Sequence, residues 1–117
     1  MATIRITDLK LKTIIGTNDW EREEKQEIII NISFDFDARR ASRSDDIRDT
    51  VDYKALKKKI MAFVESSRDY LLEKLVEDVL DLVMADKKVR AAAVRIDKPN
   101  ALRFAKSVSV ESIRKRR

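Results

Sequence analysis

An unbroken alternation of apolar and polar residues between Glu27 and Asp37 constrains the fold more than any other feature of the chain. Every second residue from Ile28 to Phe36 is apolar, whereas Asn31, Ser33 and Asp35 lie between them. A period of two places the two sets on opposite faces of an extended strand. Such a strand belongs in a sheet with one buried and one polar face, so other segments must supply partner strands and a covering layer.

The N-terminal segment predicts a second strand, from Thr3 to Ile15. Its alternation slips near Asp8, which indicates a bulge or bend. Gly16, the only glycine, follows where the apolar run stops and marks a turn. The polar segment from 17 to 25 then leads into the 27–37 strand, with Trp20 exposed.

Two amphipathic helices are predicted in the middle of the chain, after a charged and irregular segment from 38 to 48. The second helix runs from about Tyr70 to Ala85, and Asp69 is its expected N-cap. The first helix presents one apolar face, formed by Leu56, Ile60, Phe63 and Val64. Both helices need a large apolar surface opposite them, and the strand faces supply it.

The segment from Val94 to Val110 predicts a strand, a turn and a further strand. The order ββααββ indicates an α+β fold, with a four-stranded antiparallel sheet and two helices on one face. A chain of 117 residues fits a single domain over 1–117. The other face of the sheet is polar. We expect it to face water or the lumen of a ring in which sheets join edge to edge.

Histidine and cysteine are both absent. Their absence argues against a zinc enzyme and excludes Ser-His-Asp and Cys-His mechanisms, and a carboxylate-bound magnesium has no motif behind it. Acid–base chemistry must come from Lys, Tyr, Glu, Asp or water, and no cofactor is expected. Without a membrane-spanning apolar run, a signal-peptide pattern or cysteine, we expect a cytoplasmic protein with no membrane partner.

The net charge of +5 is concentrated, on the sequence, in the last four residues, Arg114 to Arg117. A short basic tail is typical of a solvated chain end, so no nucleic-acid partner is expected. A nucleic-acid binder built on this tail remains an alternative, and deletion of the tail without effect would exclude it.

Lys98 lies where the first strand of the 94–110 segment ends, directly before Pro99, the only proline. Proline fixes its own backbone and favours an extended residue before it, so Lys98 is held on a stiff strand end. That is a sound mount for a catalytic ammonium. A lysine that is merely solvated is the common alternative in a chain with 26 Lys and Arg.

Four other residues each have a structural and a functional interpretation. Glu73 suits the first turn of a helix electrostatically, but its two oxygens could accept paired N–H groups of a flat heterocycle. Tyr53 is a helix-start anchor or a proton relay. Glu21 is a loop acid or a site residue, and Arg103 flanks a turn or contacts a phosphate.

Their surroundings decide between these interpretations. The relevant segments are Ile15-Gly16, Asp19-Trp20-Glu21-Arg22 with Gln26, Asp49-Thr50-Val51-Asp52-Tyr53, Leu71-Leu72-Glu73, and Lys98-Pro99 through Val108. In this order they resemble the bacterial dihydroneopterin aldolase family and its sister, dihydroneopterin triphosphate 2'-epimerase. The resemblance covers nearly the whole chain.

The resemblance implies the tunnelling fold (T-fold), in which subunits join their sheets into a ring and two rings stack. It implies a homo-octamer of two tetrameric rings, with active sites between subunits and a pterin as substrate. Glu73 and the backbone near Leu72 would bind the pterin ring. Thr17 would also contact substrate, while Val51 and Asp52 would reach in from a neighbour.

For the chemistry, the resemblance implies that Lys98 lies near ring nitrogen N5. Glu21 would meet the diol side chain, Tyr53 of a neighbour would relay a proton, and Arg103 is a possible phosphate contact. A 7,8-dihydropterin contains an imine conjugated to its side chain. It can therefore accept the electron pair of a metal-free retro-aldol cleavage without a lysine Schiff base or a metal.

Two activities fit this residue set. An aldolase would release 6-hydroxymethyl-7,8-dihydropterin and glycolaldehyde in folate biosynthesis, whereas an epimerase would re-add the aldehyde on the other face and invert C2'. The Asp19–Arg22 motif is more similar to the aldolase branch, and the 102–108 segment is more similar to the epimerase branch. On the sequence we favour the aldolase. The epimerase is the alternative, and a non-catalytic, ring-forming pterin-binding protein is a further alternative.

Overall fold

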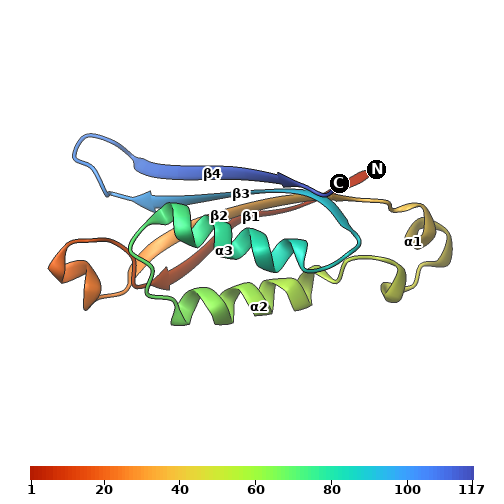
Figure 1. The fold of residues 1–117 in the computed structure, drawn as a ribbon, viewed down its shortest axis with the longest axis horizontal. Helices are drawn as coiled ribbons and strands as arrows, with labels where there is room; N and C mark the ends of the chain where they lie inside the picture. Colours follow the sequence, from red (N-terminus) through yellow and green to blue (C-terminus); the bar gives the residue numbers. More distant parts are fainter.

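The computed structural model describes residues 1–117. Its strands are β1 (Ala2–Thr13), β2 (Gln26–Phe36), β3 (Val89–Pro99) and β4 (Ser107–Lys115). Its helices are α1 (Arg39–Ser44), α2 (Tyr53–Ser66) and α3 (Leu72–Met84), with 3-10 turns η1 (Asp19–Arg22) and η2 (Ile47–Asp49). The chain extends along one axis, 52 Å long, with η1 at one end and α1 at the other (Figure 1).

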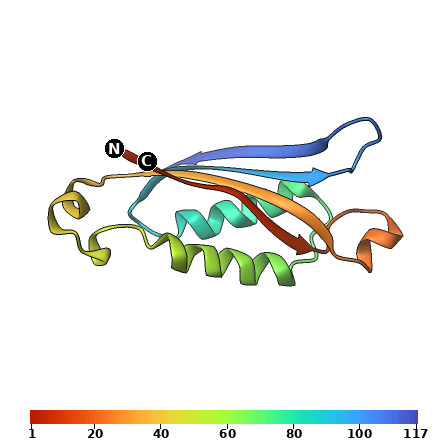
Figure 2. The same ribbon diagram turned by 180° about the vertical axis from the view of Figure 1, so that it is seen from behind.

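The four strands form one antiparallel sheet in the order β1-β2-β3-β4. Helices α2 and α3 lie on the same face of this sheet in both views (Figures 1 and 2). Helix α2 packs on β1, and α3 packs on β3 and β4. The predicted α+β fold with the order ββααββ is confirmed.

The core lies between the sheet and the two long helices. The alternating residues Ile28 to Phe36 of β2 are at most 5% exposed, and the inward face of α3 is fully buried. The predicted irregularity near Asp8 is also present. Its φ is 54°, and the pairing of β1 with β2 shifts between Ile6 and Leu9. None of the helices combines the length and apolar character needed to cross a membrane.

The helix predictions need two corrections. Asp69 does not cap the second long helix, because α3 begins only at Leu72 and Leu71 occupies the N-cap position. Two residues therefore separate the Asp69 carboxyl from the helix start. Phe63 does not belong to the buried face of α2, since it is 38% exposed whereas Ile60 and Val64 are fully buried.

The segment from 38 to 48 is not irregular, as it contains α1 and most of η2. Neither element has a buried residue, so no apolar periodicity in the sequence indicates them. Their polar contacts are local. Ser42 Oγ donates to the Ala38 carbonyl at 2.7 Å, and Asp46 accepts from the Arg48 N–H at 2.9 Å.

The basic C-terminus is not a free tail. Strand β4 continues through Lys115, and the Arg114 guanidinium forms ion pairs with Glu77 and Asp81 of α3. Arg116 donates to the carbonyls of Val89 at 2.9 Å and Asp86 at 3.3 Å, and to the carbonyl of Met84. The tail therefore ties β4 to the end of α3, where carbonyls without helical partners attract cations.

Candidate active site

A pocket of about 330 Å³ opens at the end of the molecule that carries η1 and the β3–β4 connection. Eight of its thirteen lining residues are hydrophobic, and its charged residues are Glu21, Glu73 and Lys98. The remaining lining residues are Ile15, Gly16, Thr17, Tyr70, Leu71, Leu72, Ala101, Leu102, Val108 and Val110. An apolar cleft with a few convergent polar groups is the usual form of a small-molecule site.

Glu21 and Lys98 form a buried ion pair in this pocket. Their side chains are 5% and 14% exposed. The Lys98 ammonium makes no other hydrogen bond to the protein. Because an ammonium carries three N–H donors, two remain for a bound molecule. The pair joins residues 77 positions apart in the chain, so it positions the ammonium at the end of β3 against η1.

The Glu21 carboxylate is fully engaged. One oxygen accepts from the Asn18 N–H at 3.1 Å and from the Asn18 side-chain amide at 2.8 Å. The other accepts from Gln26 Nε2 at 3.0 Å and from Lys98. Burial alone would raise the pKa of Glu21, but the hydrogen bonds from Lys98, Gln26 and Asn18 prevail and lower the pKa from 4.5 to about 2. Glu21 is therefore a carboxylate whose oxygens already have partners.

Gly16 makes room for this carboxylate. Its φ is +122°, a region that residues with a side chain rarely adopt. A Cβ at this position would stand 2.2 Å from the carboxylate carbon of Glu21. Any other residue would therefore have to displace Glu21, which explains the single glycine of the chain in chemical terms.

Arg22 joins the two loops that flank the pocket. Its guanidinium donates to the carbonyls of Gly16 at 3.0 Å and Asp69 at 3.1 Å, and to the carbonyl of Arg68. The same group lies 3.8 Å from the centre of the Tyr70 ring, within cation–π range. The segment after β1 and the connection between α2 and α3 are thus held together by one side chain.

Glu73 and Leu72 line the same pocket as the ion pair. Both belong to the first turn of α3, and Leu72 is 8% exposed. The Glu73 carboxylate is exposed and makes no hydrogen bond or ion pair within the chain. Its oxygens are therefore free to accept N–H groups from a ligand.

The model of the dihydroneopterin aldolase family matches residues 4–113. The chain is 44% identical over 110 residues to a dihydroneopterin triphosphate 2'-epimerase from Pseudomonas aeruginosa, covering 94% of this chain and 89% of that one.

The chain is also 31% identical over 110 residues to a dihydroneopterin aldolase from Escherichia coli, covering 94% of this chain and 90% of that one. A crystal structure of E. coli dihydroneopterin aldolase with neopterin superposes with a TM-score of 0.92 at 31% identity, covering 97% of this chain and 99% of that one. This chain belongs to the dihydroneopterin aldolase family.

The structure gathers part of the family-derived residue set in one pocket. Lys98, Glu21, Glu73, Leu72 and Thr17 all line it. These residues come from β3, η1, α3 and the segment after β1, which explains why no local motif contains them all.

The other predicted residues lie elsewhere in the single chain. Val51 and Asp52 line a separate hollow beside α2, at the α1 end of the molecule, and Asp52 caps α2 by accepting from the Ala55 N–H at 3.1 Å. Tyr53 begins α2 and is 52% exposed. Arg103 is exposed in the β3–β4 connection and stands 5.6 Å from the Phe104 ring, outside the pocket lining.

Sequence reasoning did not single out Asn18, Gln26 or Tyr70 as site residues. For Asn18 a signal exists, because Asn18-Asp19-Trp20-Glu21 has the spacing of a capping box, in which the fourth residue accepts from the N–H of the first. Gln26 belongs to the segments that carry the family resemblance, though no role is assigned to it there, and Tyr70 offers no signal. Each reaches the site from the end of an element that is adjacent to Glu21 or Arg22 only in three dimensions.

Proposed function

We propose that this chain is a dihydroneopterin triphosphate 2'-epimerase that works by retro-aldol cleavage and re-addition. The single observation that carries the pterin chemistry is the pocket, whose lining contains both a free Glu73 carboxylate and an ammonium fixed by Glu21. The sequence analysis favours the aldolase. The relatives reverse this preference, since the epimerases match at 44% identity and the aldolases at 31%.

The reaction begins when water, with Tyr53 of a neighbouring copy as the relay, takes up the 2'-hydroxyl proton. The C1'–C2' bond then breaks, C2' becomes the carbonyl carbon of an aldehyde, and the bonding electron pair passes into the imine of the dihydropterin ring. Nitrogen N5 takes up a proton, and the resulting enamine holds C1' as a nucleophile. Re-addition to the other face of the aldehyde inverts C2', whereas release of the aldehyde and protonation of C1' completes an aldolase turnover.

Lys98 is suited to stabilise the charge that develops at N5. Its two free N–H donors can face the substrate because the third is taken by Glu21. Glu21 acts as a positioning residue in this scheme. Its saturated oxygens leave little capacity for the diol, which differs from the role that the resemblance implies.

Glu73 is suited to anchor the pterin ring. The exposed carboxylate can accept two N–H groups of the ring edge in a bidentate pair, helped by the backbone near Leu72. The apolar wall around it, including Leu72 and Val108, fits a flat ring. Loss of Glu73 should therefore weaken binding more than it slows the bond cleavage.

The complete site requires a neighbouring subunit in this proposal. Helix α2 begins with Tyr53 at the α1 end of the molecule, whereas β3, which carries Lys98, stops at the other end (Figure 1). Tyr53 and the preceding Val51 and Asp52 can therefore serve the pocket only from another copy. Strands β1 and β4 are the two edges of the sheet and leave their outer backbone groups unpaired. Pairing of these edges into tetrameric rings that stack as an octamer would pair the outer backbone groups and bring a neighbouring subunit to each pocket.

The activity test uses purified protein with 7,8-dihydroneopterin and with its triphosphate. An epimerase converts the triphosphate to its C2' epimer without accumulating aldehyde, as chromatography of the pterins will show. Stoichiometric release of glycolaldehyde from dihydroneopterin would favour the aldolase, the second candidate, which the Asp19–Arg22 motif supports. Pterin binding with no turnover of either compound would contradict both.

Variants locate the chemistry. Lys98→Ala should lose most of kcat, and Glu73→Ala should mainly raise KM, whereas Lys106→Ala, an exposed lysine in the β3–β4 connection, is the matched control. Mixing inactive Lys98→Ala and Tyr53→Phe subunits should restore about a quarter of the sites if each site draws on two subunits. No recovery after verified subunit exchange would refute the shared site.

A further inference from the structure

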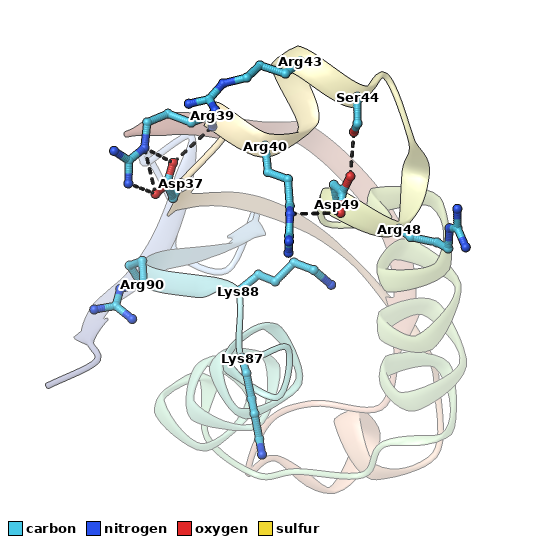
Figure 3. A pocket seen from close by; sticks show the side chains of 10 residues that line it. All are labelled: Asp37, Arg39, Arg40, Arg43, Ser44, Arg48, Asp49, Lys87, Lys88 and Arg90. Carbon is cyan, nitrogen blue, oxygen red and sulfur yellow. Dashed lines mark hydrogen bonds and ion pairs between the residues drawn. The ribbon is translucent and has the colours of Figure 1, made fainter.

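A second, wider cavity lies at the end opposite the candidate active site. It measures about 720 Å³, and its lining contains no hydrophobic residue (Figure 3). It is formed by Asp37, Arg39, Arg40, Arg43, Ser44, Arg48, Asp49, Lys87, Lys88 and Arg90. We call these ten residues the basic hollow. They come from α1, η2, the turn between α3 and β3, and the adjoining strand ends.

The basic hollow holds the charge surplus of the whole chain. It contains seven cationic and two acidic residues, and the difference equals the net charge of +5 of the entire protein. All other charges therefore balance, and the C-terminal tail, whose Arg114 is paired with two carboxylates, is not the source of an exposed positive field.

Most of these cations lack a partner. Asp37 is bound by Arg39, and Asp49 accepts from Ser44 at 2.6 Å and forms an ion pair with Arg40 at 3.8 Å. Arg48 forms an ion pair at 2.7 Å with Asp46, which lies outside the lining. Arg43, Lys87, Lys88 and Arg90 form no ion pair. Arg40 and Lys88 face each other across the middle of the hollow (Figure 3). Like charges gathered in a concavity repel each other unless an anion lies between them.

The turn that carries Lys87 and Lys88 is held by hydrogen bonds from Arg116 near the C-terminus. Arg116 donates to the carbonyls of Asp86 and Val89 on either side of this turn. The lysine backbone is therefore held in place before any ligand binds, which lowers the ordering cost of binding.

We propose that the basic hollow is a binding site for an oligophosphate chain. A triphosphate carries roughly four negative charges near neutral pH, comparable to the surplus of the hollow. Arginine guanidinium groups match phosphate oxygens in a bidentate manner. The absence of apolar and aromatic lining argues against a bound ring, and it leaves no platform on which nucleic-acid bases could stack.

The phosphate chain could belong to the substrate or to a free oligophosphate. Attribution to the substrate rests on the proposed function. The hollow shares its end of the chain with Val51, Asp52 and Tyr53, which are expected to complete the pocket of a neighbouring copy, so the hollow would be carried toward that pocket. A free inorganic or nucleotide triphosphate would instead occupy the hollow independently of catalysis.

The first experiment is calorimetric titration of the full chain with inorganic tripolyphosphate. The test variant is Arg40→Gln with Lys88→Gln, and the matched control is Lys57→Gln with Lys58→Gln, which removes the same charge from the exposed face of α2. We expect at least a tenfold rise in Kd for the test variant and less than a twofold change for the control. Equal affinities in all three proteins would overturn the proposal, as would tenfold tighter binding of a short single-stranded oligonucleotide.

A second measurement guards against misfolding and identifies the source. Tripolyphosphate should raise the Tm of the wild type and of the control but not of the test variant. A tenfold drop in the preference for the triphosphate over dihydroneopterin, seen only in the test variant, assigns the hollow to the substrate chain. An unchanged preference with lost tripolyphosphate binding assigns it to a free oligophosphate. Absence of any turnover would refute the proposed function but leave the titration decisive.

Discussion

The Glu21–Lys98 ion pair should make a large and pH-dependent contribution to stability. Replacement of Glu21 by Gln keeps the size of the side chain but removes the charge. It also places an amide N–H₂ group against hydrogen-bond donors in either orientation, those of Asn18 or those of Gln26 and Lys98. The Lys98 side chain, which is only 14% exposed, then lacks a counter-charge. A largely buried ammonium without a counter-charge strongly destabilises the folded state.

The magnitude follows from the pKa of Glu21. A folded-state pKa of about 2 against an ordinary value of 4.5 corresponds to about 3 kcal/mol of unfolding free energy at neutral pH, since each tenfold change in proton affinity is worth about 1.4 kcal/mol. We therefore expect Glu21→Gln to lower the unfolding free energy by about 3 kcal/mol and Tm by roughly 10 °C.

The pH dependence of the unfolding free energy tests whether the Glu21 carboxylate is the stabilising form. Because the folded-state pKa is depressed, the stabilisation is complete above pH 4.5 and disappears as pH falls toward 2. The gap between wild type and Glu21→Gln should close over that window. Urea unfolding at fixed protein concentration, followed by circular dichroism, measures the gap, and Glu24→Gln, an exposed glutamate just beyond η1, is the control.

A double-mutant cycle isolates the pair itself. Lys98→Met combined with Glu21→Gln removes both charges, so the double variant should be more stable than the sum of the single effects predicts, by about 2 kcal/mol. Additive effects, or a gap that stays constant from pH 7 to pH 2, would refute the inference that this ion pair stabilises the fold.

Three further perturbations have definite expected outcomes. Gly16→Ala should displace Glu21 and lower both Tm and turnover, since its Cβ would stand 2.2 Å from the carboxylate carbon; crystallography or a thermal melt checks this. Arg22→Ala should cost about 2 kcal/mol and raise KM for the pterin, because the guanidinium that joins both pocket walls is lost; steady-state kinetics measures it. Burial and the neighbouring Asp78 raise the pKa of Asp69. Ionisation of Asp69 therefore opposes folding, and Asp69→Asn should raise Tm at pH 7 by a few degrees, with the gain vanishing below its ordinary pKa of 3.8.

The sequence predicts the sheet and the long helices because burial imposes a period on them. Residues 28 to 36 alternate, and their even members are at most 5% exposed in the structure. Helix α1 escapes prediction for the opposite reason. It buries no residue, so only local hydrogen bonds and charges specify it, and these leave no periodic trace.

The same strand parity could have placed the C-terminus. Val110 faces the helices, because its partner Ile96 is in the core. Continued alternation puts Arg114 on that side as well, opposite the acidic residues of α3. The prediction of a free tail from Arg114 to Arg117 ends the strand too early, because β4 continues through Lys115. Charge runs at a chain end should therefore be read for strand parity before they are assigned to solvent.

The candidate site is less accessible to sequence reasoning because it depends on contacts between distant elements. The Glu21–Lys98 pair spans 77 positions, and no periodicity links the two residues. Family resemblance brings them together, but it cannot say that all four hydrogen bonds to Glu21 come from its own chain. That detail changes its role, because a carboxylate already satisfied by Asn18, Gln26 and Lys98 holds the ammonium rather than the substrate.

The chain thus has two chemically distinct ends. One presents an apolar pocket with a free carboxylate and a fixed ammonium, and the other presents the basic hollow and the start of α2, which is Tyr53. An unphosphorylated pterin needs only the first end and whatever Tyr53 contributes. A triphosphate substrate would carry negative charge that the cations of the second end can bind. The distribution of charge along the molecule therefore points in the same direction as the 44% identity to the epimerases, and it does so through residues that take no part in the bond cleavage.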